Sequence, residues 1–102
     1  MLQRTQTMTQ AANAATEPAL TTACFAVRAN AEPGVMPRVL ELFAKRNLVP
    51  TRFHSVVEAN DSLVIDIQME KMSARDREYL AACMRQLYDV AAVLTSEKAS
   101  AV

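Results

Sequence analysis

The sequence has no surplus of charge of either sign. Eleven lysines and arginines balance eleven aspartates and glutamates over 102 residues. Such a chain has no net field to attract a polyanion. We therefore expect no nucleic acid and no membrane surface among its partners.

Cysteine and histidine are scarce. Cys24 and Cys83 lie in different expected elements, outside any CxxC or Cys/His cluster, and we interpret both as reduced packing residues of a cytoplasmic protein, in preference to a disulfide or a metal site. His54 is the single histidine. A catalytic histidine needs an orienting carboxylate and a nucleophile, and Ser55 is expected to point to the opposite strand face. We expect an exposed or interfacial role for His54, and no catalytic residue, metal or cofactor.

Long apolar runs are absent from the first twenty residues, which are rich in Thr, Gln and Ala. This stretch is too polar for a signal peptide or a membrane span, and a transit peptide is only a weak alternative. We interpret residues 1–20 as a flexible tail, 21–97 as one domain and 98–102 as a second tail. A core of roughly 75 residues is thin, so pairing with another chain is expected.

The only glycine, Gly34, lies where a strand-like run gives way to a helix-like one. A glycine at such a junction indicates a tight turn, a close approach of a neighbour, or helix N–H groups left open to an anion. Pro37 is tolerated in the first helical turn. Asn47 can adopt the left-handed conformation that ends the helix.

Apolar periodicity predicts six elements. Strands are expected over 21–29, 48–59, 63–70 and 90–95, and helices over 35–47 and 74–87, with small polar residues from Ser96 forming a frayed end. Pro50 requires its strand to lie at a sheet edge or to begin beyond the proline. Residues 59–62 have the chemistry of a hairpin turn, and Ser73 with Asp76 resembles a capping box.

The resulting order is βαββαβ. It predicts an α+β, ferredoxin-like sandwich: a four-stranded antiparallel sheet of order 4-1-3-2 with two helices on one face. In this order the third strand lies beside the first, and the second strand, which contains Pro50, lies at an edge of the sheet. The agreement between the proline and the topology supports the prediction.

The usual chemistries of this fold are missing from the sequence. An RNA-binding sheet needs aromatic side chains on its open face, where the residues expected are Cys24, Ala26, Val64, Asp66 and Gln68. A metal-carrying version would have CxxC in the first loop, which has Glu32 and Pro33 instead. Asp66 and Glu70 share a strand face, and we interpret them as solvating residues in preference to an acid pair.

The stretch from Glu32 to Phe43 resembles an ACT domain, a small-molecule-sensing βαββαβ module marked by a Pro-Gly-hydrophobic turn before the first helix. The resemblance extends over about Ala23 to Glu97. The stretch Met84–Val90, with Val93 after it, is similar to the ending of the second helix in short-type acetolactate synthase small subunits.

This resemblance implies a non-catalytic regulatory subunit. Its partners would be a second copy of itself, forming a homodimer through the ACT domain, and the catalytic large subunit of acetolactate synthase, a thiamine-diphosphate-dependent enzyme of branched-chain amino-acid synthesis. A branched-chain amino acid would be the effector. The alternative is a stand-alone ACT-type sensor of an amino acid or another small molecule with a different partner, and an enzyme is a distant third.

The resemblance also assigns ligand-binding positions, which are Asn30, Ala31, Glu32, Gly34, Val35, Met36 and Val49. Free N–H groups near Val35 and Met36 would hold a carboxylate at the positive end of the helix. Sensing members have Asp or Asn where this chain has Ala31, and a second polar residue where it has Val49. The sequence therefore predicts a subunit that activates or stabilises its partner and senses an amino acid weakly or not at all.

Overall fold

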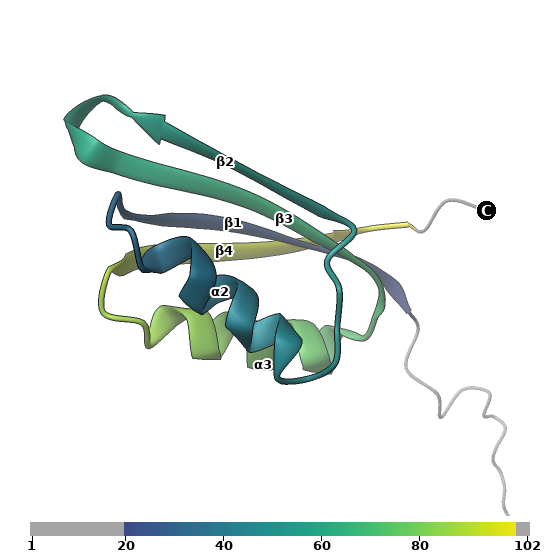
Figure 1. Cartoon of the computed structure of the whole chain (residues 1–102). Coiled ribbons are helices and arrows are strands. Elements are labelled where there is room, and N and C mark those ends of the chain that lie inside the picture. The colour runs from purple at the N-terminus through teal and green to yellow at the C-terminus, as the bar shows by residue number, and fades with distance from the viewer. Residues whose placement is uncertain (1–19, 100–102) are drawn as a thin grey trace, which may run out of the picture.

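The computed structural model describes residues 20–99, so residues 1–19 of the predicted tail over 1–20 lie outside the described residues, as do residues 100–102. The described elements, in chain order, are β1 (Thr21–Asn30), α2 (Val35–Ala44), β2 (Arg52–Glu58), the 3-10 turn η1 (Ala59–Asp61), β3 (Ser62–Met72), α3 (Ala74–Arg85) and β4 (Val90–Lys98). The strands form one antiparallel sheet of order β2-β3-β1-β4, and both helices cover the same face (Figure 1). The predicted fold is confirmed.

The core lies between this sheet face and the helices. Alternate residues of β1 and β3 point into it, and helical spacing supplies the facing layer from α2 and α3. The largest fully buried side chains are Phe25, Phe43, Leu63, Ile65, Ile67, Leu80, Met84, Val27 and Val39. Phe25 of β1 meets Phe43 of α2 edge to face, with ring centroids 5.8 Å apart. This contact holds α2 against the middle of the sheet.

Local signals at the element ends are confirmed. Ser73 Oγ accepts a hydrogen bond from the Asp76 N–H at 3.2 Å, which caps α3. Asn47 has a φ of 64° just beyond α2, and the β2–β3 hairpin turns through Asn60 and Asp61 at φ of 66° and 56°. Asparagine and aspartate tolerate this left-handed conformation better than most residues.

Two strand boundaries differ from the prediction. β2 begins at Arg52 and ends at Glu58, so the expected start at residue 48 is wrong, whereas its place at the sheet edge beyond Pro50 is confirmed. β4 continues to Lys98, which pairs with Thr22 of β1, so the frayed end expected from Ser96 is also wrong. Backbone pairing extends β4 where the side-chain pattern carries no apolar signal.

The two sheet edges differ in accessibility. Along β4, Arg85 Nη2 donates to Val93 O at 2.7 Å, Thr95 Oγ1 donates to Glu78 Oε2 at 2.8 Å, and Arg77 Nη1 pairs with Glu97 Oε1 at 2.7 Å. The hydrogen bond from Arg77 lowers the pKa of the Glu78 carboxyl, and the bond from Thr95 adds to it. Side chains of α3 thus bind β4 along its length, while β2 is the less protected edge.

Candidate functional site

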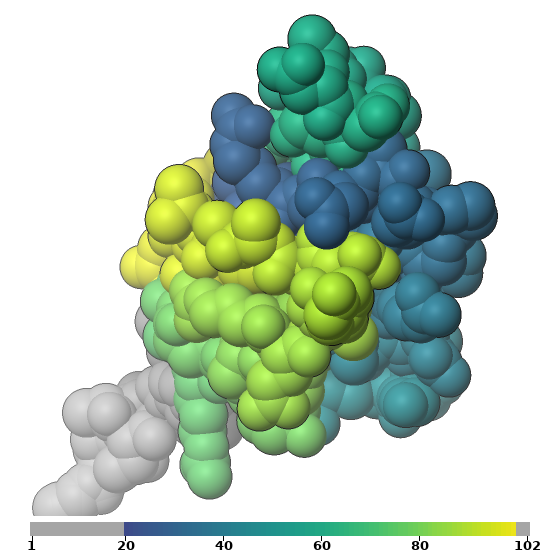
Figure 2. All heavy atoms as spheres, turned by 90° about the vertical axis from the view of Figure 1, so that its left-hand side faces the viewer, coloured from purple at the N-terminus to yellow at the C-terminus, as the bar shows by residue number. Residues whose placement is uncertain are grey.

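The candidate site lies at the end of the molecule where β1 stops. Figure 2 shows this end, which brings together the start of α2, the turn between α3 and β4, and the β2–β3 hairpin. The Asn30 N–H donates to Asp89 O and the Ala31 N–H to Asp61 O, each at 2.9 Å. Backbone hydrogen bonds from the end of β1 therefore reach both of the other turns.

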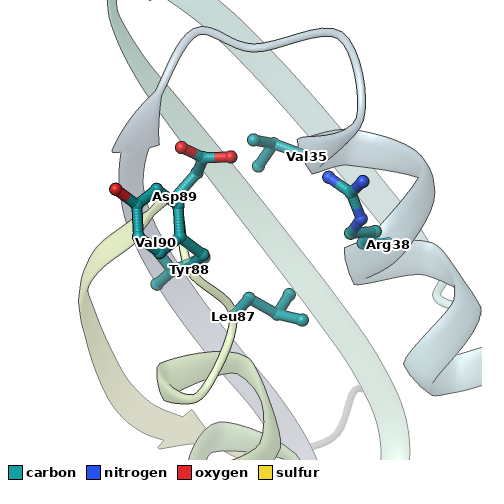
Figure 3. Close-up of a pocket in the computed structure, with 6 residues that line it drawn as sticks. All are labelled: Val35, Arg38, Leu87, Tyr88, Asp89 and Val90. Atoms are coloured by element: carbon teal, nitrogen blue, oxygen red, sulfur yellow. The ribbon is translucent and has the colours of Figure 1, made fainter.

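A pocket of about 360 Å³ separates the first turn of α2 from the α3–β4 turn. Its lining residues, drawn in Figure 3, are Val35, Arg38, Leu87, Tyr88, Asp89 and Val90. The aliphatic side chains among them give it apolar walls, and it has one cationic and one anionic group. We call it the Arg38–Asp89 pocket.

Gly34 lies directly beside the cationic group. Its φ of −83° and ψ of −6° are open to any residue, so the backbone conformation does not require glycine. A Cβ at this position would instead meet the Arg38 guanidinium, with Cζ at 2.8 Å, and the exposed, flexible arginine side chain would have to move aside. Of the three explanations for this glycine, close approach of a neighbour is the one with an observed contact, and the neighbour is a guanidinium.

Asp89 is held in place by Asn30. The Asn30 backbone N–H donates to Asp89 O at 2.9 Å, and Asn30 Nδ2 donates to Asp89 Oδ1 at 3.4 Å. Figure 3 shows the carboxylate directed toward Val35 and the α2 side of the pocket. Within residues 20–99, neither Arg38 nor Asp89 forms an ion pair. Opposite charges across an apolar space suit a small zwitterion.

The helix N-terminus offers fewer free donors than expected. The Val35 N–H donates to Glu32 O at 3.1 Å and the Arg38 N–H to Gly34 O at 3.2 Å, while Pro37 has no N–H to donate. Val35 is therefore not the free donor that the sequence suggested. An anion here would depend more on the Arg38 guanidinium.

A second pocket of about 190 Å³ lies on the other side of the same turn. It is lined by Ala31, Glu32, Pro33, Met36, Val57 and Leu63. Ser55 Oγ donates to Met36 Sδ at 3.1 Å, which ties α2 to β2 beside this pocket. We call it the Met36 pocket.

The predicted ligand-binding residues are thus divided. Asn30, Gly34 and Val35 adjoin the Arg38–Asp89 pocket, and Ala31, Glu32 and Met36 adjoin the Met36 pocket. Val49 lies in the loop after α2, at the far end of that helix from Gly34, and is 79% exposed. Within one chain, Val49 is not brought together with the others.

Sequence reasoning did not assign a site role to Arg38 or Asp89. Residues four apart on a helix are neighbours, and Arg38 is four residues beyond the single glycine, so that spacing was an available signal. Asp89 comes near α2 only because α3 and β4 pack against the rest of the domain. No local sequence pattern predicts that packing. The place of Asp89 within the Leu87–Val90 stretch quoted for the resemblance was the only hint.

Other parts of the described chain offer little chemistry. His54 is exposed on the open face of the sheet, opposite Asp66 in the β2–β3 register. Residues 20–99 contain no group of three or more His, Cys, Asp and Glu side chains placed to hold a metal ion. Among the described helices, none is both long and apolar enough to cross a membrane.

Comparison with known proteins gives a family and a fold. A family model described as an ACT-like domain matches residues 16–101. The ACT domain from the GTP pyrophosphokinase of Chlorobium tepidum is similar in structure, with a TM-score of 0.66, 9% identity, and coverage of 76% of this chain and 100% of that one. A search of curated proteins by sequence finds no match.

Two further solved structures share the fold. A homoserine dehydrogenase from Thiobacillus denitrificans has a TM-score of 0.66 and 17% identity, with coverage of 79% of this chain and 18% of that one. The C-terminal domain of the MgtC protein from Mycobacterium tuberculosis has a TM-score of 0.62 and 16% identity, with coverage of 78% and 88%. At such low identities these likenesses show the fold alone.

Proposed function

Since this chain belongs to the ACT-like domain family, we propose that it is a regulatory small subunit of acetolactate synthase, which activates or stabilises the catalytic subunit. ACT domains are typically regulatory, non-catalytic and ligand-binding. One observation carries the finer assignment. The stretch that resembles the synthase subunit, which ends in the Leu87–Val90 turn, lies across the Arg38–Asp89 pocket from Val35, which belongs to the turn that resembles ACT domains in general.

The proposed subunit pairs with a second copy along the β2 edge. ACT domains commonly dimerise, and β2 is hydrogen-bonded only to β3. Exposed apolar side chains lie on β2 and on the adjoining helix and loop, with Val57 61%, Leu40 39% and Val49 79% exposed. A strand edge flanked by apolar side chains favours extension of the sheet by another strand.

Such a dimer would reunite the predicted site residues. Antiparallel pairing of two β2 strands about Ser55, the middle residue of Arg52–Glu58, sets the start of one strand against the end of the other. Val49 of one copy then lies toward the hairpin of the second copy, where Asp61 is bonded to Ala31. We propose the Met36 pocket, completed in this way, as the position of the remaining ligand-binding residues.

Regulation then requires no chemistry of the subunit's own. A subunit that binds one conformation of the catalytic enzyme more tightly than another shifts the enzyme toward the first. An effector that alters this preference is coupled to the enzyme by the same free energy in both directions. The proposal needs only a stable contact surface and a pocket near it.

Purification from the native cell tests this function. We expect a large thiamine-diphosphate-dependent enzyme to co-purify with the chain, and we expect addition of the chain to raise the rate at which that enzyme forms acetohydroxy acids. Phe43→Ala, which removes a buried ring, serves as the destabilised control. Recovery of the chain without such an enzyme, together with unchanged synthase activity, would refute the assignment.

The Arg38–Asp89 pocket favours a second candidate function, an amino-acid sensor with another partner. Its guanidinium suits a carboxylate, its carboxylate suits an ammonium group, and its apolar walls suit an aliphatic side chain. Calorimetry with valine, leucine and isoleucine, on the wild type and on Arg38→Gln, measures this directly. Arg75→Gln, an exposed change on α3, is the matched control. Micromolar binding lost only in Arg38→Gln would favour the sensor over a weakly sensing subunit.

A further inference from the structure

The face of the sheet opposite the helices is uncovered by any described element (Figure 1). A shallow hollow of about 570 Å³ crosses it, with Cys24, Ala26 and Ser96 among the small side chains in its floor. Leu94 stands at its border and is 72% exposed. A hollow beside a projecting leucine is a shape that can accept a complementary apolar group.

The strand register arranges this face in rows that run across the sheet. One row consists of His54, Asp66, Ala26 and Leu94, and the next of Val56, Val64, Arg28 and Ala92. Outside them on β2 lie Arg52 on one side and Glu58 on the other. The two rows are equivalent in position, and on β4 and β1 a large side chain of one row stands next to a small one of the other, Leu94 next to Ala92 and Arg28 next to Ala26.

From this register we propose that the open face binds a second copy of the chain, sheet on sheet, about a two-fold axis that runs across the strands between these rows. This axis exchanges the rows, so Leu94 of each copy meets Ala92 of the other. Two β-sheets pack in this way with their strands nearly aligned and their inner side chains interdigitated. A two-fold contact forms every such pairing twice.

Charges on the face match under the same axis. Arg52 of one copy lies over Glu58 of the second copy, and Arg28 lies diagonally across from Asp66. Arg28 and Glu58 already form a pair at 3.6 Å within one chain, with both side chains more than half exposed, so each can accept another partner. Alternation of opposite charges across the contact disfavours other alignments of the two sheets.

The size of the face indicates what assembly it supports. Four strands about 4.8 Å apart, of 10, 7, 11 and 9 residues at ~3.4 Å per residue, cover roughly 600 Å² per copy. That is below the ~800 Å² per partner in a standard interface, whereas two edge-paired copies together present roughly 1,200 Å². The face contact therefore completes a four-copy assembly of two edge dimers. In this respect it rests on the dimer within the proposed function.

The two contacts are geometrically compatible. The edge pairing is symmetric about Ser55, and Ser55 lies between the same two rows that the face axis separates. The axes therefore cross, and the assembly closes without leaving either surface free. Closure limits the assembly to four copies.

Light scattering of the full chain during gel filtration tests the proposal. We expect the wild type to have about four times the chain mass of 11.2 kDa and Leu94→Arg to have about twice that mass, with unchanged circular dichroism because Leu94 is exposed. Tyr88→Arg, 97% exposed and outside the face, is the control and should retain four copies. Val57→Arg, which breaks the edge, should also give two copies, and the Leu94→Arg/Val57→Arg double variant one.

An error in the proposed face contact and an error in the proposed function give different experimental results. A two-copy wild type that Leu94→Arg leaves unchanged and Val57→Arg converts to monomer overturns the face contact and retains the edge dimer. The face contact is also overturned if Tyr88→Arg reduces the mass of the assembly as much as Leu94→Arg does. The effect of Leu94→Arg would then not be specific to the face. The role in acetolactate synthase is decided separately, by co-purification.

Discussion

The position of α2, and with it both pockets, depends on Phe43. Its buried ring meets Phe25 at an interplanar angle of 89°. Phe43→Ala should cost roughly 3–5 kcal/mol, which is a large part of the roughly 4–12 kcal/mol expected for about 80 ordered residues. Phe43→Leu is more informative because it keeps most of the apolar volume. We expect it to lower the free energy of unfolding by about 1–2 kcal/mol, from a nearly volume-conserving swap plus the lost aromatic contact.

Urea denaturation followed by circular dichroism measures this loss of unfolding free energy. A double-mutant cycle shows how much of it comes from the contact between Phe43 and Phe25. Phe43→Leu, Phe25→Leu and their combination should show a coupling of about 0.5–1.5 kcal/mol, the value of an edge-to-face pair beyond its buried area. Leu40→Ala on the same helix, where the side chain is partly exposed, should cost less than Phe43→Leu and show no coupling to Phe25. A coupling near zero between the two phenylalanines would refute the reasoning, because it would mean that α2 is held by general burial alone.

Three further predictions concern local contacts. Ser73→Ala should destabilise the chain by about 0.5–2 kcal/mol through loss of the α3 cap, whereas Ser73→Asp should retain most of the stability; urea midpoints decide between them. Glu78→Gln should cost about 0.2–1 kcal/mol at pH 7, because the half-exposed carboxylate is screened by solvent. Since the folded-state pKa of Glu78 is lowered, this stabilisation is present above its unfolded value and is lost as pH falls through the folded value, so the difference from wild type should vanish in acid. Asn60→Ala should lose roughly 1 kcal/mol and Asn60→Gly should not, because only the former strains the left-handed turn.

Strong periodicity made the central strands predictable. Alternation over 21–29 and 63–70 identified β1 and β3, because both have one face in the core and one in solvent. The helices followed from their apolar spacing and from Ser73, Asn47 and the turn before Val35. Pairing of these elements then followed from topology rules, since short connections and crossovers leave few arrangements of βαββαβ.

The outer strands were less predictable for a physical reason. Val49 continues an apolar alternation, but strand pairing begins only where the Thr51 N–H donates to Gln68 O at 2.9 Å. At the other edge, the polar residues after Thr95 pair with β1, and Glu97 gains Arg77 as a partner. An edge strand is defined by backbone partners on one side, and those partners are distant in sequence.

The candidate site shows the same limit more sharply. Gly34 marked the correct junction, yet the group that approaches it is the side chain of Arg38, and the opposing Asp89 comes from a turn 55 residues later in the printed sequence. A pattern confined to one element can identify a helix start, but it cannot identify the charge that faces that start. Each of the two resemblance stretches is a weak local signal. Only the tertiary structure shows that they line the same pocket. Because Asn30 binds Asp89 through both its backbone and its side chain, the end of β1 holds the anionic wall of this pocket, while the cationic wall belongs to α2.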